Sequence, residues 1–345
     1  MSVQIRLLGN KKNISHLSEA LSKGRLSHAY IINAPKGGGK KTLAEYLAYG
    51  LLCDSINAQS ARTLEDGPCG TCLSCIRAFS GNHPDMIRVF KDKKDKSISV
   101  DLIRERIIDD INIKPYYGRY KIYIVEDAHL MSESAQNALL KTIEEPPSYA
   151  VILLLTENPK AFLPTILSRC ICLDAERLPR QQIADVLKTD CNVSRADAEK
   201  YADYASGNLG IAIDLAGEGT KKALIEDILV SLKKMHAMDA GEIYEYAVRL
   251  ADESISEVLD IYRKLFRDIL MIRSGCQKDN GRQSLYFNAE SILLTKAAKE
   301  MTYEQINGAF AAIDTAEHRA QANVKADAVL EALLLSLRGQ MCFDL

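Results

Sequence analysis

Apolar stretches of two kinds alternate along the first half of the chain. Short, mostly apolar runs that suit strands lie at residues 29–33, 86–90, 121–125, 150–155 and 170–173, and the run at 150–155 is continuously apolar. Between them, apolar residues recur every three or four positions, as in helices that bury one face, at residues 41–52, 102–110 and 133–143. Strands that alternate with helices predict an α/β domain, with a parallel five-stranded sheet covered by helices on both faces.

After Pro179 the strand-like runs stop and only helical periodicity remains. A compact three-helix stretch occupies about residues 181–216, and long amphipathic segments such as 255–272 follow it. We therefore expect three domains, which are an α/β domain at residues 1–177, a small three-helix domain at 178–218 and an all-α domain at 219–345.

Composition narrows the class of protein. The 44 Lys and Arg residues nearly balance the 46 Asp and Glu residues, which argues against a polycation that binds DNA by bulk charge. The first residues hold no apolar signal core, and the longest apolar run is far shorter than a membrane span of about 20 residues. We therefore expect a soluble, cytoplasmic chain with reduced thiols, in which clustered cysteines are metal ligands before they are disulfides.

A glycine-rich turn at residues 34–42 joins the first predicted strand to a helix, which is the context of a phosphate-binding loop. Gly39 and Lys40 match the motif G-x-x-x-x-G-K-[ST], whereas Ala34 replaces its first glycine and Lys41 its hydroxyl residue. An ammonium group cannot ligate the Mg²⁺ that this hydroxyl would hold. Thr42 comes one residue late and faces about 100° away around the helix.

The loop therefore has the sequence context of a phosphate-binding loop but lacks the residue that would bind Mg²⁺. The alternative is a glycine-rich turn that binds no ligand, which the strand-to-helix context and the retained lysine make less attractive. Weak ATP binding without turnover stays open, and the sequence argues against Mg²⁺. The candidate nucleotide-binding residues of the loop are Gly37, Gly38, Gly39, Lys40, Lys41 and Thr42.

Two carboxylates, Glu126 and Asp127, follow the third predicted strand. In hydrolytic phosphate-loop proteins the corresponding pair is Asp then Glu, where the Asp supports Mg²⁺ and the Glu polarises the attacking water. Here the order is reversed, and the shorter Asp127 would leave a water-polarising oxygen about 1 Å out of place, which can lower a rate on the order of 10²-fold. The alternative for such a pair is a solvated strand end without a function.

Cysteines form the strongest local motif of the chain. Cys69, Cys72 and Cys75 are separated by two residues each, and Cys53 lies at the end of the helix that follows the glycine-rich turn. Four thiolates predict a structural Zn²⁺ site, which stabilises a fold and leaves no open position for catalysis. Cys53 is the expected fourth ligand, with His83 as the alternative. This zinc module occupies about residues 53–83.

Several longer strings carry a resemblance to a known family. They are residues 26–30 (LSHAY), 125–129 (VEDAH), 136–147 (QNALLKTIEEPP), 156–158 (TEN) and 167–170 (LSRC). With the degenerate loop and the cysteine module, they resemble the AAA+ clamp-loader subunits of bacterial DNA polymerase III over about the first 215 residues. The resemblance implies an AAA+ domain, a helical lid and a helical collar that assembles with other subunits.

The resemblance also implies partners and residue roles. The family's subunits form a hetero-pentameric ring of delta, delta-prime and three gamma/tau subunits, which uses ATP to load a sliding clamp onto primed DNA. It implies that Arg169 is an arginine finger that acts in trans on the ATP site of a neighbouring gamma/tau subunit. Thr156 and Asn158 would correspond to the first polar sensor of the chain's own nucleotide site.

Within the family, the pattern of losses favours the delta-prime type. Gly210 stands where motor subunits carry an Arg that contacts phosphate. The chain thus lacks this Arg, the hydroxyl residue that would bind Mg²⁺, and the Asp-then-Glu order of the acidic pair. Arg169, in contrast, is present. We expect no polymerase active site and little or no ATPase activity. The alternatives are an ATP-hydrolysing gamma/tau-type motor subunit and, from a different class, a stand-alone zinc-containing DNA-binding protein.

Overall fold

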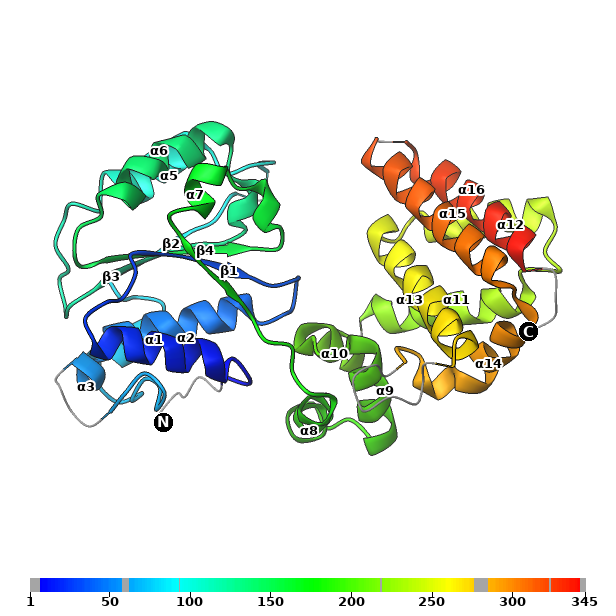
Figure 1. Cartoon of the computed structure of the whole chain (residues 1–345), viewed down its shortest axis with the longest axis horizontal. Coiled ribbons are helices and arrows are strands. Elements are labelled where there is room, and N and C mark those ends of the chain that lie inside the picture. Colours follow the sequence, from blue (N-terminus) through cyan, green and yellow to red (C-terminus); the bar gives the residue numbers. More distant parts are fainter. Residues whose placement is uncertain are drawn as a thin grey trace. The chain divides into compact units, whose positions relative to one another are not determined.

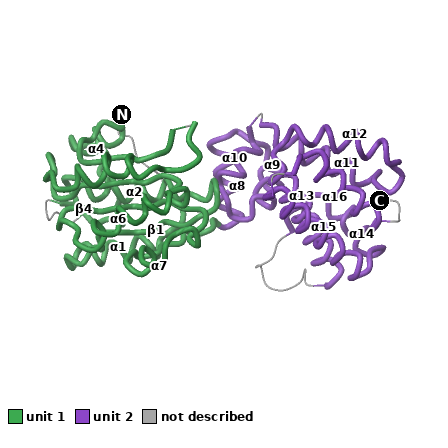
Figure 2. The backbone as a smooth tube through the Cα atoms, turned by 90° about the horizontal axis from the view of Figure 1, so that it is seen from above, with its two compact units in different colours: residues 1–178 green, residues 179–345 purple. Residues whose placement is uncertain are grey.

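The computed structural model of the chain describes residues 7–57, 62–92, 94–217, 219–275, 285–322 and 324–341. The chain divides into two compact units, which are residues 1–178 and residues 179–345 (Figure 2). The first unit holds every strand of the described residues, and the second is helical.

The first unit is built on a five-stranded sheet in the order β2-β3-β4-β1-β5, in which all neighbouring strands are parallel. The strands are β1 (Ala29–Asn33), β2 (Met86–Val89), β3 (Lys121–Val125), β4 (Ala150–Thr156) and β5 (Ile171–Asp174). The expected α/β class and parallel sheet are confirmed. Because the strands are parallel, the segments that follow β1, β3 and β4 leave the same edge of the sheet, where ligands bind in such folds.

Helices cover both faces of this sheet (Figure 1). One face carries α1 (Lys11–Ser22), α2 (Lys40–Leu52), α3 (Asp54–Asn57) and α4 (Leu73–Phe79). The other face carries α5 (Val100–Ile103), the π-helical turn η1 (Arg104–Ile108), α6 (Glu133–Glu144) and α7 (Pro164–Leu167). The 3₁₀ turns η2 (Ala128–Leu130) and η3 (Pro159–Ala161) follow β3 and β4.

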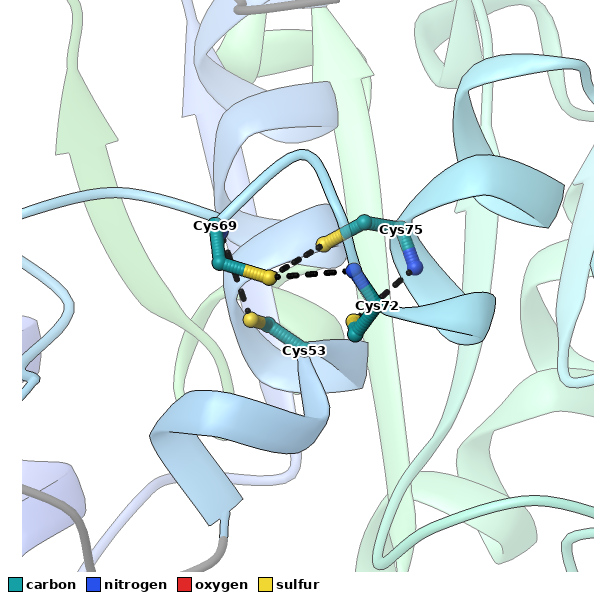
Figure 3. A group of neighbouring side chains, drawn as sticks. All are labelled: Cys53, Cys69, Cys72 and Cys75. Atoms are coloured by element: carbon teal, nitrogen blue, oxygen red, sulfur yellow. Dashed lines mark hydrogen bonds between the residues drawn. The ribbon is translucent and has the colours of Figure 1, made fainter. Parts of the chain in front are cut away.

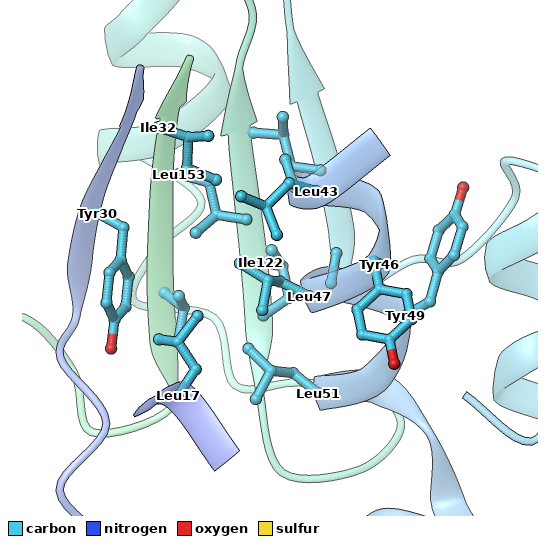
Figure 4. Close-up of a cluster of buried hydrophobic side chains, with 14 of the residues drawn as sticks. Leu17, Tyr30, Ile32, Leu43, Tyr46, Leu47, Tyr49, Leu51, Ile122 and Leu153 are labelled. Carbon is cyan, nitrogen blue, oxygen red and sulfur yellow. The ribbon is translucent and has the colours of Figure 1, made fainter. Parts of the chain in front are cut away.

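The two-residue period of the strands divides the core into two clusters. Tyr30 and Ile32 of β1 pack with Leu43 and Leu47 of α2 on one face (Figure 4), whereas Ile31 packs on the opposite face. Both faces of β1 are therefore buried, which is why this strand reads as a continuous apolar run in the sequence.

The helix expected at residues 102–110 differs from the observed one. It starts earlier, as α5, and continues as the π-helical turn η1. Ile103, Ile107 and Ile111 are all buried at a spacing of four residues. Side chains four apart drift around an α-helix of 3.6 residues per turn, and the wider π turn counteracts this drift.

A buried carboxylate orders the loop that leads into β3. Asp85, which directly precedes β2, is fully buried and accepts hydrogen bonds from the backbone N–H groups of Tyr116 and Tyr117, each at 2.7 Å. The two tyrosine side chains themselves are exposed. The carboxylate therefore joins segments about thirty residues apart and fixes the course of an exposed loop.

Replacing Asp85 with alanine should destabilise the protein, because two backbone N–H groups lose a charged acceptor. We expect the free energy of unfolding to fall by about 2–4 kcal/mol in a denaturant titration. The exposed Asp92 provides the matched control, for which we expect a change within about 0.5 kcal/mol. Equal effects of the two substitutions would contradict the role given to Asp85.

The second unit consists of helices in the part of it that the structure describes. They are α8 (Arg180–Asp190), α9 (Arg195–Ala205), α10 (Leu209–Ala216), α11 (Thr220–Lys234), α12 (Ala240–Leu250), α13 (Ile255–Arg273), α14 (Ser291–Glu300), α15 (Tyr303–Gln321) and α16 (Ala326–Gln340), with a 3₁₀ turn η5 (Asn288–Glu290). Tyr262 and Phe266 of α13 are fully buried. Across the described residues, no helix has the length and apolarity needed to cross a membrane. The division of this unit into a small domain and a collar stays a prediction.

Candidate nucleotide and metal sites

The glycine-rich loop connects β1 to α2 and has the backbone of a tight turn. Gly37 and Gly39 adopt φ angles of 77° and 86°, in the left-handed region that favours glycine. A Cβ atom on Gly38 would lie 3.0 Å from the carbonyl oxygen of Pro35. The loop therefore needs its glycines for its own shape. The helix α2 then begins at Lys40 with no side chain capping its N-terminus.

Lys40, the lysine at the end of the glycine-rich loop, forms an ion pair with a carboxylate of the same chain. Lys40 Nζ lies 2.7 Å from Oε1 of Glu157, and the Lys40 side chain is only 11% exposed. Glu157 directly follows β4, which pairs with β1 up to Asn33 and Thr156, so both segments leave neighbouring strand ends. Sequence reasoning named residues 156 and 158 as candidates and missed Glu157. The signal available was an acidic residue at a strand end beside a lysine-bearing loop.

Lys41, which replaces the hydroxyl residue of the motif, also forms an ion pair. The ammonium group of Lys41 lies 3.0 Å from the Glu126 carboxylate at the end of β3. Arg88 of β2 lies 3.5 Å from the same carboxylate and 2.8 Å from Glu45 of α2. Glu126 therefore faces two cations of the chain. The neighbouring Asp127 is exposed and has a left-handed φ of 48°.

The other candidates of this site have local roles. The Thr156 hydroxyl is buried and accepts a hydrogen bond from the Asn158 N–H at 3.0 Å. The Asn158 side chain accepts from the Lys160 N–H at 3.1 Å and so caps η3. Thr42 is exposed on the first turn of α2.

Arg169 lies on the surface, two residues after the end of α7 (Pro164–Leu167). Its Nε is 2.9 Å from Oε1 of Glu144 at the end of α6, and its Nη1 donates to the Thr165 carbonyl oxygen at 3.0 Å. Both partners of the ion pair are well exposed, at 40% and 47% of their side-chain surface. An ion pair this exposed contributes about 0.2–1 kcal/mol, so the guanidinium can readily exchange Glu144 for another anion.

Four cysteines converge on one point, as the sequence predicts (Figure 3). The Sγ atoms of Cys53, Cys69, Cys72 and Cys75 all lie within 4.8 Å of one another, and those of Cys69 and Cys75 are 3.9 Å apart. Four sulfurs at about 2.3 Å from a Zn²⁺ ion form a tetrahedron with edges of about 3.8 Å. The arrangement is therefore compatible with a tetrahedral metal site.

Backbone groups support thiolate character in this cluster. The N–H groups of Cys69, Cys72 and Cys75 each donate to a sulfur of the preceding cysteine in the set, at 3.3–3.4 Å. A hydrogen bond from the Cys75 thiol lowers the pKa of Cys53 to about 4 and raises the pKa of Cys75. A bound cation would relieve this sharing of protons, because metal ligation requires all four thiolates.

His83, the alternative fourth ligand, lies outside the cysteine cluster. Its Nδ1 accepts a hydrogen bond from the Asp85 N–H at 3.1 Å, and burial lowers the pKa of its imidazole. Cys53, placed directly after α2, therefore completes the group of four.

The parallel sheet and its helical layers define an α/β protein with a glycine-rich loop at the end of β1. Residues 9–179, about half of the chain, match the family described as "DNA polymerase III, delta subunit". The resemblance that the sequence motifs indicated is confirmed.

Individual relatives cover the chain to different extents. The delta' subunit of DNA polymerase III from Bacillus subtilis is 29% identical, over 93% of this chain and 94% of its own length. The tau/gamma subunit from Haemophilus influenzae is 34% identical over 61% of this chain. The chain spans only about a third of the length of such tau relatives, at 30–32%. Among solved structures, the Bacillus subtilis clamp loader delta protein matches 94% of the chain, with 16% identity and a TM-score of 0.34.

Proposed function

We propose that the chain is the delta-prime subunit of a DNA polymerase III clamp loader, which loads the sliding clamp onto primed DNA during replication. The observation that carries the proposal is the match to a delta' subunit along nearly the whole of both chains, whereas tau/gamma relatives match only part of theirs. The partners are delta and gamma/tau subunits in a hetero-pentameric cytoplasmic ring. Sliding clamp and primed DNA are engaged by the assembled complex.

In this proposal the chain contributes an arginine finger and no ATP hydrolysis of its own. Arg169 supplies a guanidinium to the γ-phosphate bound by a neighbouring gamma/tau subunit, where it stabilises charge in the transition state. Its exposure and its weak intrachain pair with Glu144 support this role. The engaged Lys40, the ammonium of Lys41 and the reversed carboxylates support the absence of turnover.

The four cysteines hold a structural Zn²⁺ ion in this proposal. Among the described residues between α2 and β2, the buried hydrophobic side chains besides the cysteines are Leu64 and Ala78. A segment with so little apolar core gains much of its stability from a metal. The zinc thus fixes the insertion between α2 and β2 and takes no part in chemistry.

The proposal is tested by reconstitution with the delta and gamma/tau subunits, the sliding clamp and primed DNA. Omitting this chain should abolish clamp loading and the clamp-dependent ATP turnover, because the ring then lacks a subunit and an arginine finger. Adding back the purified chain should restore both. Turnover that is equally fast without the chain would contradict the proposal. Brisk ATP hydrolysis by the purified chain alone would instead favour a gamma/tau-type motor subunit.

A further inference from the structure

We infer that Glu157 occupies the phosphate position of the chain's own loop and excludes nucleotide from it. The inference rests on the proposed function, in which this loop performs no hydrolysis, and it names the residue that decides whether ATP still binds. It concerns a carboxylate that lies within the 156–158 string but is absent from the candidate site residues named from the sequence.

The pairing of Glu157 with Lys40 follows from the sheet. β1 and β4 are parallel neighbours whose last paired residues are Asn33 and Thr156. The loop that leaves β1 and the residue that follows β4 therefore emerge side by side. The Lys40 ammonium sits 2.7 Å from the Glu157 carboxylate, the distance at which such a lysine contacts a phosphate oxygen. A carboxylate thus takes the place that a terminal phosphate takes in a working loop.

Three cations beside the loop each face a carboxylate of the chain. Lys40 faces Glu157, and Lys41 faces Glu126 at 3.0 Å. Arg88 faces Glu45 at 2.8 Å and Glu126 at 3.5 Å. A phosphate-binding site attracts its ligand through an excess of positive potential. A triphosphate that entered here would displace one carboxylate and approach a second, so like-charge repulsion opposes its binding.

The same pair explains why the lysine persists in a loop without turnover. Lys40 is nearly buried, and an unpaired ammonium at such a position destabilises a fold. Glu157 compensates this charge permanently. Lys40 then ties the loop to the end of β4 and is not available to bind a nucleotide.

The test measures ATP binding to the full chain by isothermal titration calorimetry, with and without Mg²⁺. We expect Glu157→Gln and Glu157→Ala to bind ATP at least about 10-fold more tightly than the wild type, because the repulsion is removed and Lys40 becomes available. The double variant Lys40→Ala/Glu157→Gln should lose this gain. Glu19→Gln removes the same charge from an exposed pair with Lys23 and should bind as the wild type does.

Each outcome decides the inference. Wild-type binding as tight as that of Glu157→Gln would overturn it, and so would a gain that survives the removal of Lys40. Circular dichroism verifies that each variant is folded, and Glu157→Ala provides a second readout if Glu157→Gln unfolds. The proposed function is tested separately through Arg169, which this experiment leaves intact. A chain whose Glu157 variants fail to gain ATP but which still activates the reconstituted complex would overturn only the inference.

Discussion

Replacing Arg169 with alanine should sharply lower the DNA-stimulated ATP turnover of the reconstituted complex while leaving this chain folded. Arginine fingers contribute about 10³–10⁵-fold in rate at the site they serve. We therefore expect ATP hydrolysis at the neighbouring gamma/tau site to stop. The total ATP turnover of the complex should fall at least by the fraction that this site contributes. Folding should be unaffected, because the exposed pair with Glu144 contributes at most about 1 kcal/mol.

Two further variants separate a finger from a surface charge. Arg263→Ala removes another exposed arginine from an ion-paired surface, with Asp314 at 2.7 Å and Glu317 at 2.9 Å, and should leave turnover unchanged. Arg169→Lys keeps the charge but loses the planar fork that contacts two phosphate oxygens, so it should recover little activity. Steady-state ATP hydrolysis with clamp and primed DNA measures all three. Wild-type turnover in the Arg169→Ala complex would rule out the finger.

Glu144 offers a complementary measurement on the same surface. Because this carboxylate holds Arg169 in the free chain, Glu144→Gln releases the guanidinium without removing it. The expected effect on turnover is small, since a partner's phosphates outcompete an exposed carboxylate for the arginine. Loss of turnover in Glu144→Gln as deep as in Arg169→Ala would indicate that the ion pair itself is needed.

The centre of the sheet could be predicted from the sequence because β1, β3 and β4 are buried on both faces. A strand such as β4, in which every residue is buried, must be continuously apolar, and that pattern is visible without a structure. The cysteine cluster was equally accessible, since its spacing follows from the short turns that bring ligands to one metal ion. In both cases the determinant lies within a short stretch of chain.

The ion pairs could not be predicted, because they depend on which strand ends meet. Glu157 lies 117 residues from Lys40, and only the strand order brings β1 beside β4. The same holds for Asp85 and the two tyrosine N–H groups about thirty residues away. Likewise, the choice between Cys53 and His83 needed the fold, because one precedes the cysteine motif, the other follows it, and spacing alone does not decide between them. The local sequence pattern determines the helices and strands, whereas these contacts between distant residues depend on the order of the strands in the sheet.

Replacing Cys72 with serine should abolish zinc binding and strongly destabilise the segment between α2 and β2. Cys72 caps the N-terminus of α4 by accepting from the Cys75 N–H at 3.3 Å, and its sulfur belongs to the group of four. We expect about one zinc per wild-type chain by metal analysis and none in Cys72→Ser. Structural zinc binds zinc-finger peptides with about 10–16 kcal/mol, so the loss should be visible as a large drop in melting temperature.

Two control substitutions, of a cysteine outside the cluster and of His83, identify the zinc ligands. Cys172→Ser changes an exposed cysteine of β5 that lies outside the cluster, and should retain both zinc and stability. His83→Gln tests the alternative ligand, and should also retain zinc because Cys53 completes the set. Acidification should release the metal from the wild type, since protons compete with Zn²⁺ for the four thiolates as pH falls. Wild-type chain that is free of zinc, yet melts at the same temperature with and without a chelator, would show that the thiols stabilise this insertion without a metal.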